Sequence, residues 1–97
     1  MNVAFDCDGT LIRHQDDTPR YDIIKLFHIL EALGCTMYIW SGGGVDYAER
    51  WRDKLGLTAT VVAKGSFKPE IAIDDEYVTL GLVNLNVDGA GSGWKKN

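Results

Sequence analysis

Two carboxylates near the start of the chain, Asp6 and Asp8, stand one residue apart directly after a short apolar run. The run at residues 3–5 is too short for a helix and leads into the turn residues Gly9 and Thr10, which predicts a brief buried strand. Acids at the carboxyl end of a buried strand repel each other and are poorly hydrated, so they indicate a bound cation or a phosphoryl chemistry that uses them. Gly9 has no side chain and lets the backbone amides of the loop approach a ligand closely.

These two acids could divide the work of phosphate-ester hydrolysis. The Asp6 carboxylate can attack phosphorus and form an aspartyl-phosphate, which replaces one difficult step by two easier ones. Asp8 is placed to protonate the leaving oxygen and then to take a proton from water. A metal-free turn, in which an Asp side chain caps the loop, is the alternative explanation. The apolar strand that precedes the acids favours a catalytic or cation-binding role over this turn.

Candidate phosphate ligands follow two later strands. A serine and three glycines occupy residues 41–44, where the Ser41 hydroxyl and the Gly42 amide at a helix start could bind an anion. Taken alone, this motif is explained better by a simple strand-to-helix turn. Lys64, directly after a strand, could neutralise phosphate oxygens, and Lys68 is a rival for this role. For either lysine alone, an exposed surface charge is the better explanation.

Further acids close another apolar strand. Asp74 and Asp75 end this strand, and Glu76 extends the acidic run. Together with Asp6 they would supply the carboxylates that hold Mg²⁺ beside a phosphate. An acidic surface loop is the alternative. Four acids converging on one sheet edge would repel strongly unless a divalent cation screened them, which favours the metal site.

The remaining residues whose side chains could take part in catalysis or metal binding are not assigned to the site. His14 and His28 lack partners at ligand spacing, and His14 is expected to be exposed. Cys7 lies between two acids that raise its pKa, which makes it a poor nucleophile. Two cysteines, Cys7 and Cys35, form no disulfide framework and favour reduced thiols in the cytoplasm.

Alternating strand and helix patterns predict the scaffold that positions these residues. A Thr18-Pro19 start predicts a first helix, and an apolar face after residue 44 predicts a second. The expected helices cover residues 19–33 and 45–55, and the expected strands cover 3–5, 35–40, 59–63 and 70–73, with an edge strand near 83–87. This order predicts an α/β fold with an open, mostly parallel sheet and right-handed crossovers. Ligands of such sheets bind beyond the carboxyl ends of the strands, where every candidate cluster lies.

Composition bounds the remaining possibilities. Ninety-seven residues, 45% of them hydrophobic, predict one domain over 1–97, with its core in about 1–76 and an edge strand and flexible tail in 77–97. The net charge is −4 and the basic residues are scattered, so we expect no non-specific binding of nucleic acid, although a local cradle for an end phosphate remains open. No signal peptide or membrane span is recognisable, which predicts a cytoplasmic protein with no membrane partner.

In the order of these motifs the chain resembles the haloacid dehalogenase superfamily of phosphotransferases. The motifs are Asp6-Cys7-Asp8-Gly9-Thr10, a serine at 41, a lysine at 64 or 68, and an acidic pair at 74–75. The resemblance covers about residues 1–76 and rests mainly on the first motif. It implies a small three-layer, Rossmann-like sheet with helices on its faces and no cap domain, because neither connection that carries a cap in the family has room for one.

The resemblance also implies roles for the candidate residues. Asp6 would be the nucleophile and a metal ligand, and Asp8 the acid and base, which binds Mg²⁺ through its main-chain carbonyl. Asp74 and Asp75 would complete the metal site. The phosphate ligands would be Thr10, Ser41, Gly42 and Lys64, with Lys68 as the alternative lysine.

Without a cap, the implied site is open and suits a large or exposed phosphate, such as a nucleic-acid end, a phosphoprotein or a phosphosugar on a polymer. The helix that is usual between the third and fourth strands is missing from the pattern, which leaves a homodimer open as a means of completing the protein. The sequence therefore predicts a Mg²⁺-dependent phosphomonoester hydrolase. The alternative is a catalytically weak or silent phosphate- or metal-binding regulatory module of the same fold.

Overall fold

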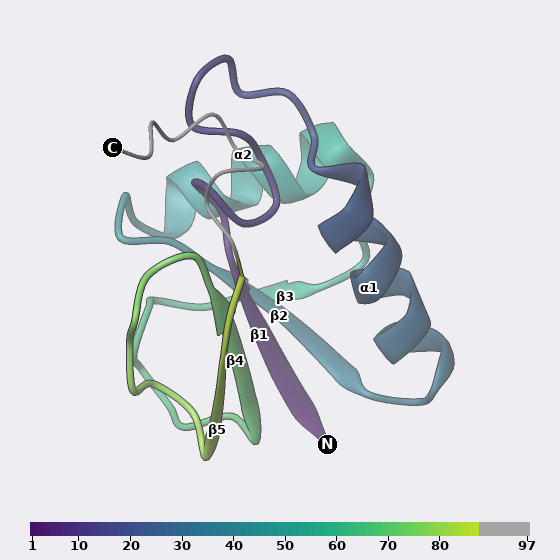
Figure 1. Cartoon of the computed structure of the whole chain (residues 1–97), viewed down its shortest axis with the longest axis vertical. Helices are drawn as coiled ribbons and strands as arrows, with labels where there is room; N and C mark the ends of the chain where they lie inside the picture. Colours follow the sequence, from purple (N-terminus) through teal and green to yellow (C-terminus); the bar gives the residue numbers. More distant parts are fainter. Residues whose placement is uncertain (88–97) are drawn as a thin grey trace.

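The structure of the protein, a computed structural model, describes residues 1–87 (Figure 1). Five strands and two helices follow one another along this part of the chain. Their bounds are β1 Asn2–Asp6, α1 Tyr21–Ala32, β2 Thr36–Trp40, α2 Val45–Leu55, β3 Thr60–Val61, β4 Ile71–Asp74 and β5 Val83–Asn86. The flexible tail expected at the end of the chain lies largely in residues 88–97, outside the described residues.

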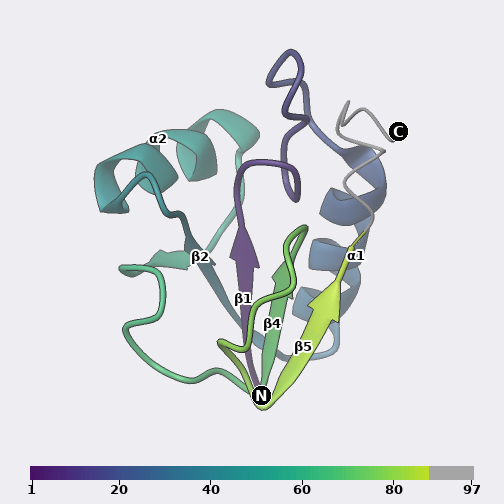
Figure 2. The same cartoon turned by 60° about the vertical axis from the view of Figure 1, so that its left-hand side comes forward.

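All five strands belong to one parallel sheet in the order β3-β2-β1-β4-β5. The predicted α/β class is therefore confirmed, and the sheet is entirely rather than mostly parallel. The chain runs outward from β1 through β2 to β3, and then returns to the other side of β1 to form β4 and β5. The order of strands thus reverses between β1 and β4, whose carboxyl ends lie at the same edge of the sheet (Figure 2).

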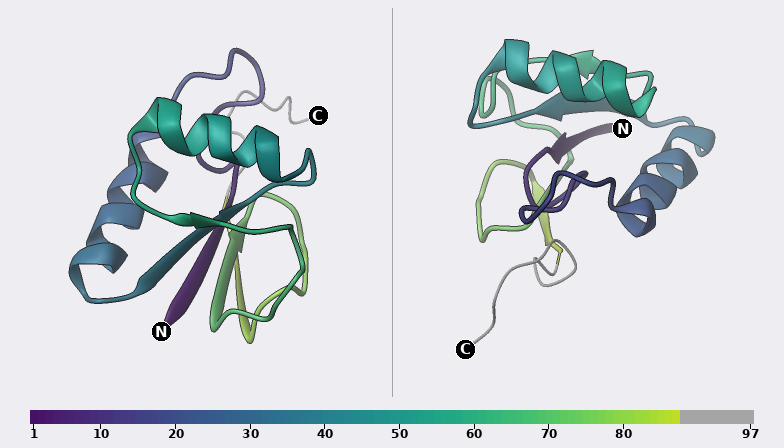
Figure 3. Two further views of the ribbon diagram at one scale, coloured as in Figure 1. Left: turned by 180° about the vertical axis from the view of Figure 1, so that it is seen from behind. Right: turned by 90° about the horizontal axis from the view of Figure 1, so that it is seen from above.

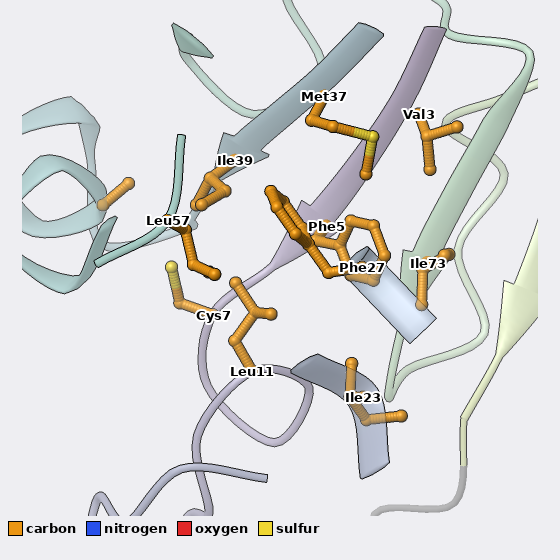
Figure 4. Packing of buried hydrophobic residues seen from close by; sticks show 11 residues of the cluster. Val3, Phe5, Cys7, Leu11, Ile23, Phe27, Met37, Ile39, Leu57 and Ile73 are labelled. Atoms are coloured by element: carbon orange, nitrogen blue, oxygen red, sulfur yellow. The ribbon is translucent and has the colours of Figure 1, made fainter. Parts of the chain in front are cut away.

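The main core lies on one face of this sheet, where both helices pack. Its centre is formed by odd-numbered residues of the strands, such as Phe5 and Ile39, against Phe27 of α1 and Ala48 of α2 (Figure 4). The opposite face carries a smaller cluster of Ala4, Trp40 and Ala72, against which residues of the connecting loops pack. Figure 1 shows α1 on one side of the strands and the green loops that flank β4 on the other.

The expectation of three layers is therefore wrong for residues 1–87, because no helix in this part of the chain covers the second face of the sheet. The connection at 62–70 reaches β4 without a helix, and Phe67 from this connection takes the place of a helical side chain. Its ring packs against Tyr38 and Trp40, with centroid distances of 4.7 and 5.8 Å. A loop can cover this face because its three buried members include two alanines, which leave little apolar surface to bury.

The second helix begins and ends where the sequence predicts, whereas the first begins later than expected. Pro19 forms an antiparallel bridge with Ile12, and the Arg20 amide donates to the Leu11 carbonyl. The backbone around Pro19 is thus extended, and helical geometry begins only at Tyr21. A local Thr-Pro signal was overridden by pairing with the loop after β1, which fixes that loop next to the site.

The predicted edge strand is present as β5, which pairs with β4 alone. The connection from β4 to β5 is short for a parallel crossover. The Asn84 side chain stabilises it by accepting from the Leu80 and Gly81 amides and donating to the Gly81 carbonyl. Within residues 1–87, neither helix is long and apolar enough to cross a membrane.

Candidate active site

The candidate site lies where the order of strands reverses. Asp6 is the last residue of β1 and Asp74 the last residue of β4, and the two strands are hydrogen-bonded neighbours. Side chains that follow strands on either side of such a reversal line a crevice that adjoining crossovers leave open. The topology therefore brings the acids after β1 and the acids after β4 together.

Lys64 joins these two acids. Its Nζ lies 3.0 Å from Oδ1 of Asp6 and 2.8 Å from Oδ2 of Asp74. Both carboxylates are almost fully buried, and the lysine side chain is 19% exposed. Lys68, the rival lysine, is exposed in the connection before β4 and takes no part in this group. Lys64 is therefore the lysine that the structure places beside Asp6.

The protonation of Asp6 reflects a competition within this group. Burial and then the negative charge of Asp74 raise the pKa of Asp6 to about 7, against the lowering effect of Lys64. Burial opposes the charge of Lys64, but its contacts with Asp74 and Asp6 prevail and raise the pKa of the lysine to about 12. One ammonium group thus offsets two carboxylates only in part, and a further cation would be stabilised here.

Asp8 stands on the other side of the loop and is held by a residue that the sequence did not single out. The hydroxyl of Tyr47, on α2, donates a hydrogen bond of 2.7 Å to Oδ1 of Asp8. Burial and this hydrogen bond raise the pKa of the tyrosine to about 12, so it remains a donor. The two residues are 39 positions apart, and the helical pattern predicted only that α2 packs through its apolar residues.

His14 is exposed, as expected, but the expectation that it has no partner is wrong. Its Nε2 lies 2.8 Å from Oδ2 of Asp75, and its side chain is 32% exposed. Gly9 allows this approach, because a Cβ at that position would lie 2.1 Å from Oδ2 of Asp75 and 2.3 Å from Nε2 of His14. Arg20 fixes the same turn by donating to the Gly9 carbonyl at 3.0 Å. The loop after β1 is therefore tied to the acidic loop after β4.

The remaining predicted residues fall into two groups. Ser41 and Gly42 line the cavity beside Asp6, and Oγ of Ser41 accepts a hydrogen bond of 3.0 Å from the Gly43 amide. Thr10 is fully buried, outside the residues that line the cavity, with its hydroxyl 3.5 Å from Oδ2 of Asp6. Thr10 thus supports the carboxylate from the interior.

These residues enclose an open cavity of about 300 Å³. It is lined by Asp6, Asp8, His14, Ser41, Gly42, Gly43, Lys64, Asp75 and Glu76. The lining therefore combines two acids of β1 and its loop, a lysine, a serine followed by glycines, and acids of the loop after β4. Such a set can bind an anion at the lysine and serine, and a cation at the carboxylates.

The carboxylates fit a hard divalent cation. One oxygen from each of Asp6, Asp74 and Asp75 lies within 4.8 Å of the others. Oδ2 of Asp74 is buried and receives no aligned hydrogen bond in the described part of the chain, although Lys64 is close enough for an ionic contact. An oxygen in this state is available as a metal ligand, and oxygen donors are those that Mg²⁺ prefers.

Cys7 is fully buried beneath the loop, in the main core. Burial, followed by the charges of Asp6 and Asp8, raises the pKa of its thiol to about 12. The expectation that it is a poor nucleophile therefore agrees with its surroundings.

Comparisons of the chain with protein-family models, with curated proteins and with solved structures find no match. The function must accordingly be argued from the site itself.

Proposed function

We propose that the protein is a Mg²⁺-dependent phosphomonoester hydrolase that forms an aspartyl-phosphate on Asp6. The observation that carries this proposal is the group of Asp6, Lys64 and Asp74 at the ends of β1 and β4, with Nζ of the lysine 3.0 and 2.8 Å from the two carboxylates. Asp6 and Lys64 of this group line the cavity. This chemistry requires a nucleophilic carboxylate, a cation that holds phosphate oxygens and a second acid that transfers protons. Asp6, Lys64 and Asp8 would fill these roles. The motif order of the haloacid dehalogenase superfamily supports the same proposal.

In the first half-reaction an oxygen of Asp6 attacks phosphorus, and the bond between phosphorus and the ester oxygen breaks. Asp8 gives its proton to the departing oxygen, which leaves as an alcohol. In the second half-reaction water attacks the same phosphorus, Asp8 takes a proton from it, and the bond to Asp6 breaks to release inorganic phosphate. Tyr47 holds Asp8 through its 2.7 Å hydrogen bond and so positions the group that moves both protons.

Lys64 and Ser41 bind and orient the phosphoryl oxygens, and the lysine stabilises the charge that they carry. Asp6, Asp74 and Asp75 are the side chains that would hold Mg²⁺, with the Asp8 carbonyl as the further ligand that the family resemblance implies. When bound, the ion supplies charge neutralisation for the phosphate and for the clustered acids.

Hydrolysis of a generic aryl phosphate tests this function. We expect turnover with Mg²⁺, none with EDTA, and none in Asp6→Asn protein, which also controls for contaminating phosphatases. Asp53→Asn is the matched control, because that carboxylate is 70% exposed on α2 and lies outside the cavity lining. Turnover that persists in Asp6→Asn would exclude the aspartyl-phosphate mechanism.

A binding module without efficient catalysis is the second candidate, and the contacts of Lys64 favour it. The lysine is paired with both Asp6 and Asp74, which leaves one of its three N–H donors for a phosphate. Tight Mg²⁺-dependent binding of beryllofluoride would support an Asp6 that accepts phosphoryl groups. A protein that binds Mg²⁺ but neither binds beryllofluoride nor turns over substrate would support the binding module.

A further inference from the structure

A second hollow, of about 280 Å³, is lined by residues of α2 and of the loop that precedes α1. Its lining residues are Asp17, Tyr47, Arg50, Trp51 and Lys54. All but Asp17 come from α2 and are spaced three or four positions apart on one side of the helix. Figure 3 shows this helix crossing in front of the strands when the molecule is seen from behind.

Tyr47 connects this hollow to the active-site cavity. Its ring lines the hollow, while its hydroxyl donates to Asp8, which lines the cavity. A Cβ on Gly43, another cavity residue, would lie 3.1 Å from the same ring. A leaving group that took its proton from Asp8 would therefore depart next to Tyr47, the residue that also lines the hollow.

The side chains of the hollow combine aromatic surface with positive charge. Cζ of Arg50 lies 5.8 Å from the Tyr47 ring centroid, and Nζ of Lys54 lies 5.0 Å from that of Trp51. Two cations and one acid give the lining a net positive charge on a chain whose own charge is −4. Aromatic faces stack on nucleobases, and arginine and lysine bind phosphate oxygens.

We propose that this hollow binds the nucleoside and the adjoining phosphate of a nucleotide phosphomonoester, so that the substrate is the phosphorylated end of a single-stranded oligonucleotide. The proposal deepens the phosphatase function and depends on it for the placement of the terminal phosphate at Asp6. Two cations within one helical turn can hold one phosphodiester group. They form no long basic stripe, which agrees with recognition of an end and not of an extended strand.

Direct binding tests the subsite in Asp6→Asn protein, in which a bound ligand is not hydrolysed. The probes are dithymidylates phosphorylated at the 5′ or the 3′ end, titrated calorimetrically in Mg²⁺. Arg50→Ala/Lys54→Ala should weaken binding of the better probe about tenfold, the combined effect of two exposed charge contacts. The slope of log affinity against log salt should fall by about 0.7, as expected for one fewer neutralised phosphate charge.

Two single variants serve as matched comparisons. Asp17→Asn removes the acid that lines the hollow among residues 1–87 and should tighten binding. Lys25→Ala removes an exposed lysine of the other helix and should change nothing. Alanine preserves helical propensity at these exposed positions, so the variants should fold.

The outcomes separate the subsite from the phosphatase function. Unchanged affinity and salt slope in Arg50→Ala/Lys54→Ala, or no binding of either probe, would overturn the subsite, even if aryl phosphate is hydrolysed. An inactive native protein that still binds the probes through Arg50 and Lys54 would reject the hydrolysis but support nucleotide recognition. Equal losses in the double variant and in Lys25→Ala would mean that only overall charge matters, which also overturns the subsite.

Discussion

Asp6 is the residue on which burial, like charge and a neighbouring cation act together. Burial and Asp74 raise its pKa to about 7, so the folded protein holds more protons than the unfolded chain between about pH 4 and pH 7. The free energy of unfolding of the metal-free protein should therefore fall as the pH rises through this interval. The total decrease in the free energy of unfolding over this interval would be about 4 kcal/mol at most.

Urea unfolding in EDTA at several pH values measures this dependence. Asp6→Asn cannot ionise and should flatten the curve, whereas Asp53→Asn, with its exposed carboxylate, should leave it in place. A native curve that is flat or rises from pH 4 to pH 7 would contradict the assignment of this titration to Asp6.

The two lysines offer a second test at the same scale. Lys64→Met should lower kcat/KM by a factor of about 10² to 10³, because it removes a preorganised charge next to the phosphoryl oxygens. Lys68→Met should change kcat/KM little, since Lys68 is exposed and lies outside the cavity lining. Steady-state kinetics on an aryl phosphate, below the melting temperature of both variants, makes the comparison. Similar losses in both variants would argue against a special role for Lys64.

At the scale of elements, the loop after β1 is fixed through a close approach that only glycine permits. Gly9 has a φ of 80°, and a Cβ there would overlap both His14 and Asp75. Gly9→Ala should separate these side chains or shift the loop, and lower the free energy of unfolding by about 2 kcal/mol or more. Gly34 has a φ of 89° but no atom near its added Cβ, so Gly34→Ala should show the backbone strain alone, about 1 kcal/mol.

Chemical denaturation of the two variants separates overlap from strain, and Mg²⁺ titration reports on the site. Only Gly9→Ala should weaken Mg²⁺ binding, because only Gly9 adjoins a candidate ligand. Equal effects of the two substitutions on both stability and Mg²⁺ affinity would refute the role given to Gly9.

Local patterns were sufficient to predict the order of the elements and the position of the candidate acids. The second helix, the edge strand and the placement of acids at strand ends follow from periodicity and turn residues that lie within a few positions of one another. The start of α1 could not be predicted, because the pairing of Pro19 with Ile12 is a tertiary contact that overrides the Thr18-Pro19 signal. The sequence pattern contains no helix between the third and fourth strands, but the packing of Phe67 on the second face is a tertiary contact without a local signature.

The contacts of His14 and Tyr47 escaped prediction for the same reason. Their partners, Asp75 and Asp8, are 61 and 39 positions away, and no local spacing connects them. Only the adjacency of β1 and β4, and the packing of α2 beside the loop after β1, bring them together. A search of strand ends for polar residues finds the acids, whereas residues that position them from loops and helices have no such signature.

At the scale of the whole molecule, the carboxylates of Asp6, Asp74 and Asp75 gather at one end of a small sheet with helices on one face. A cation that binds only the folded state should stabilise the entire chain by mass action. At a Mg²⁺ concentration one hundred times Kd the gain is about 2.7 kcal/mol. For a domain of this size that corresponds to a rise in Tm of about 10–20 °C.

Thermal unfolding with increasing MgCl₂, against NaCl of matched ionic strength, measures this coupling. Asp74→Asn should remove most of the rise, because Asp74 contributes a buried oxygen to the carboxylate group, and Asp53→Asn should retain it. A rise of the same size in Asp74→Asn would mean that Mg²⁺ acts on the net charge of −4 and not at the end of the sheet. A Tm that does not respond to Mg²⁺ would remove the cation from the proposed mechanism, because the same acids would then be balanced by Lys64 and protons alone.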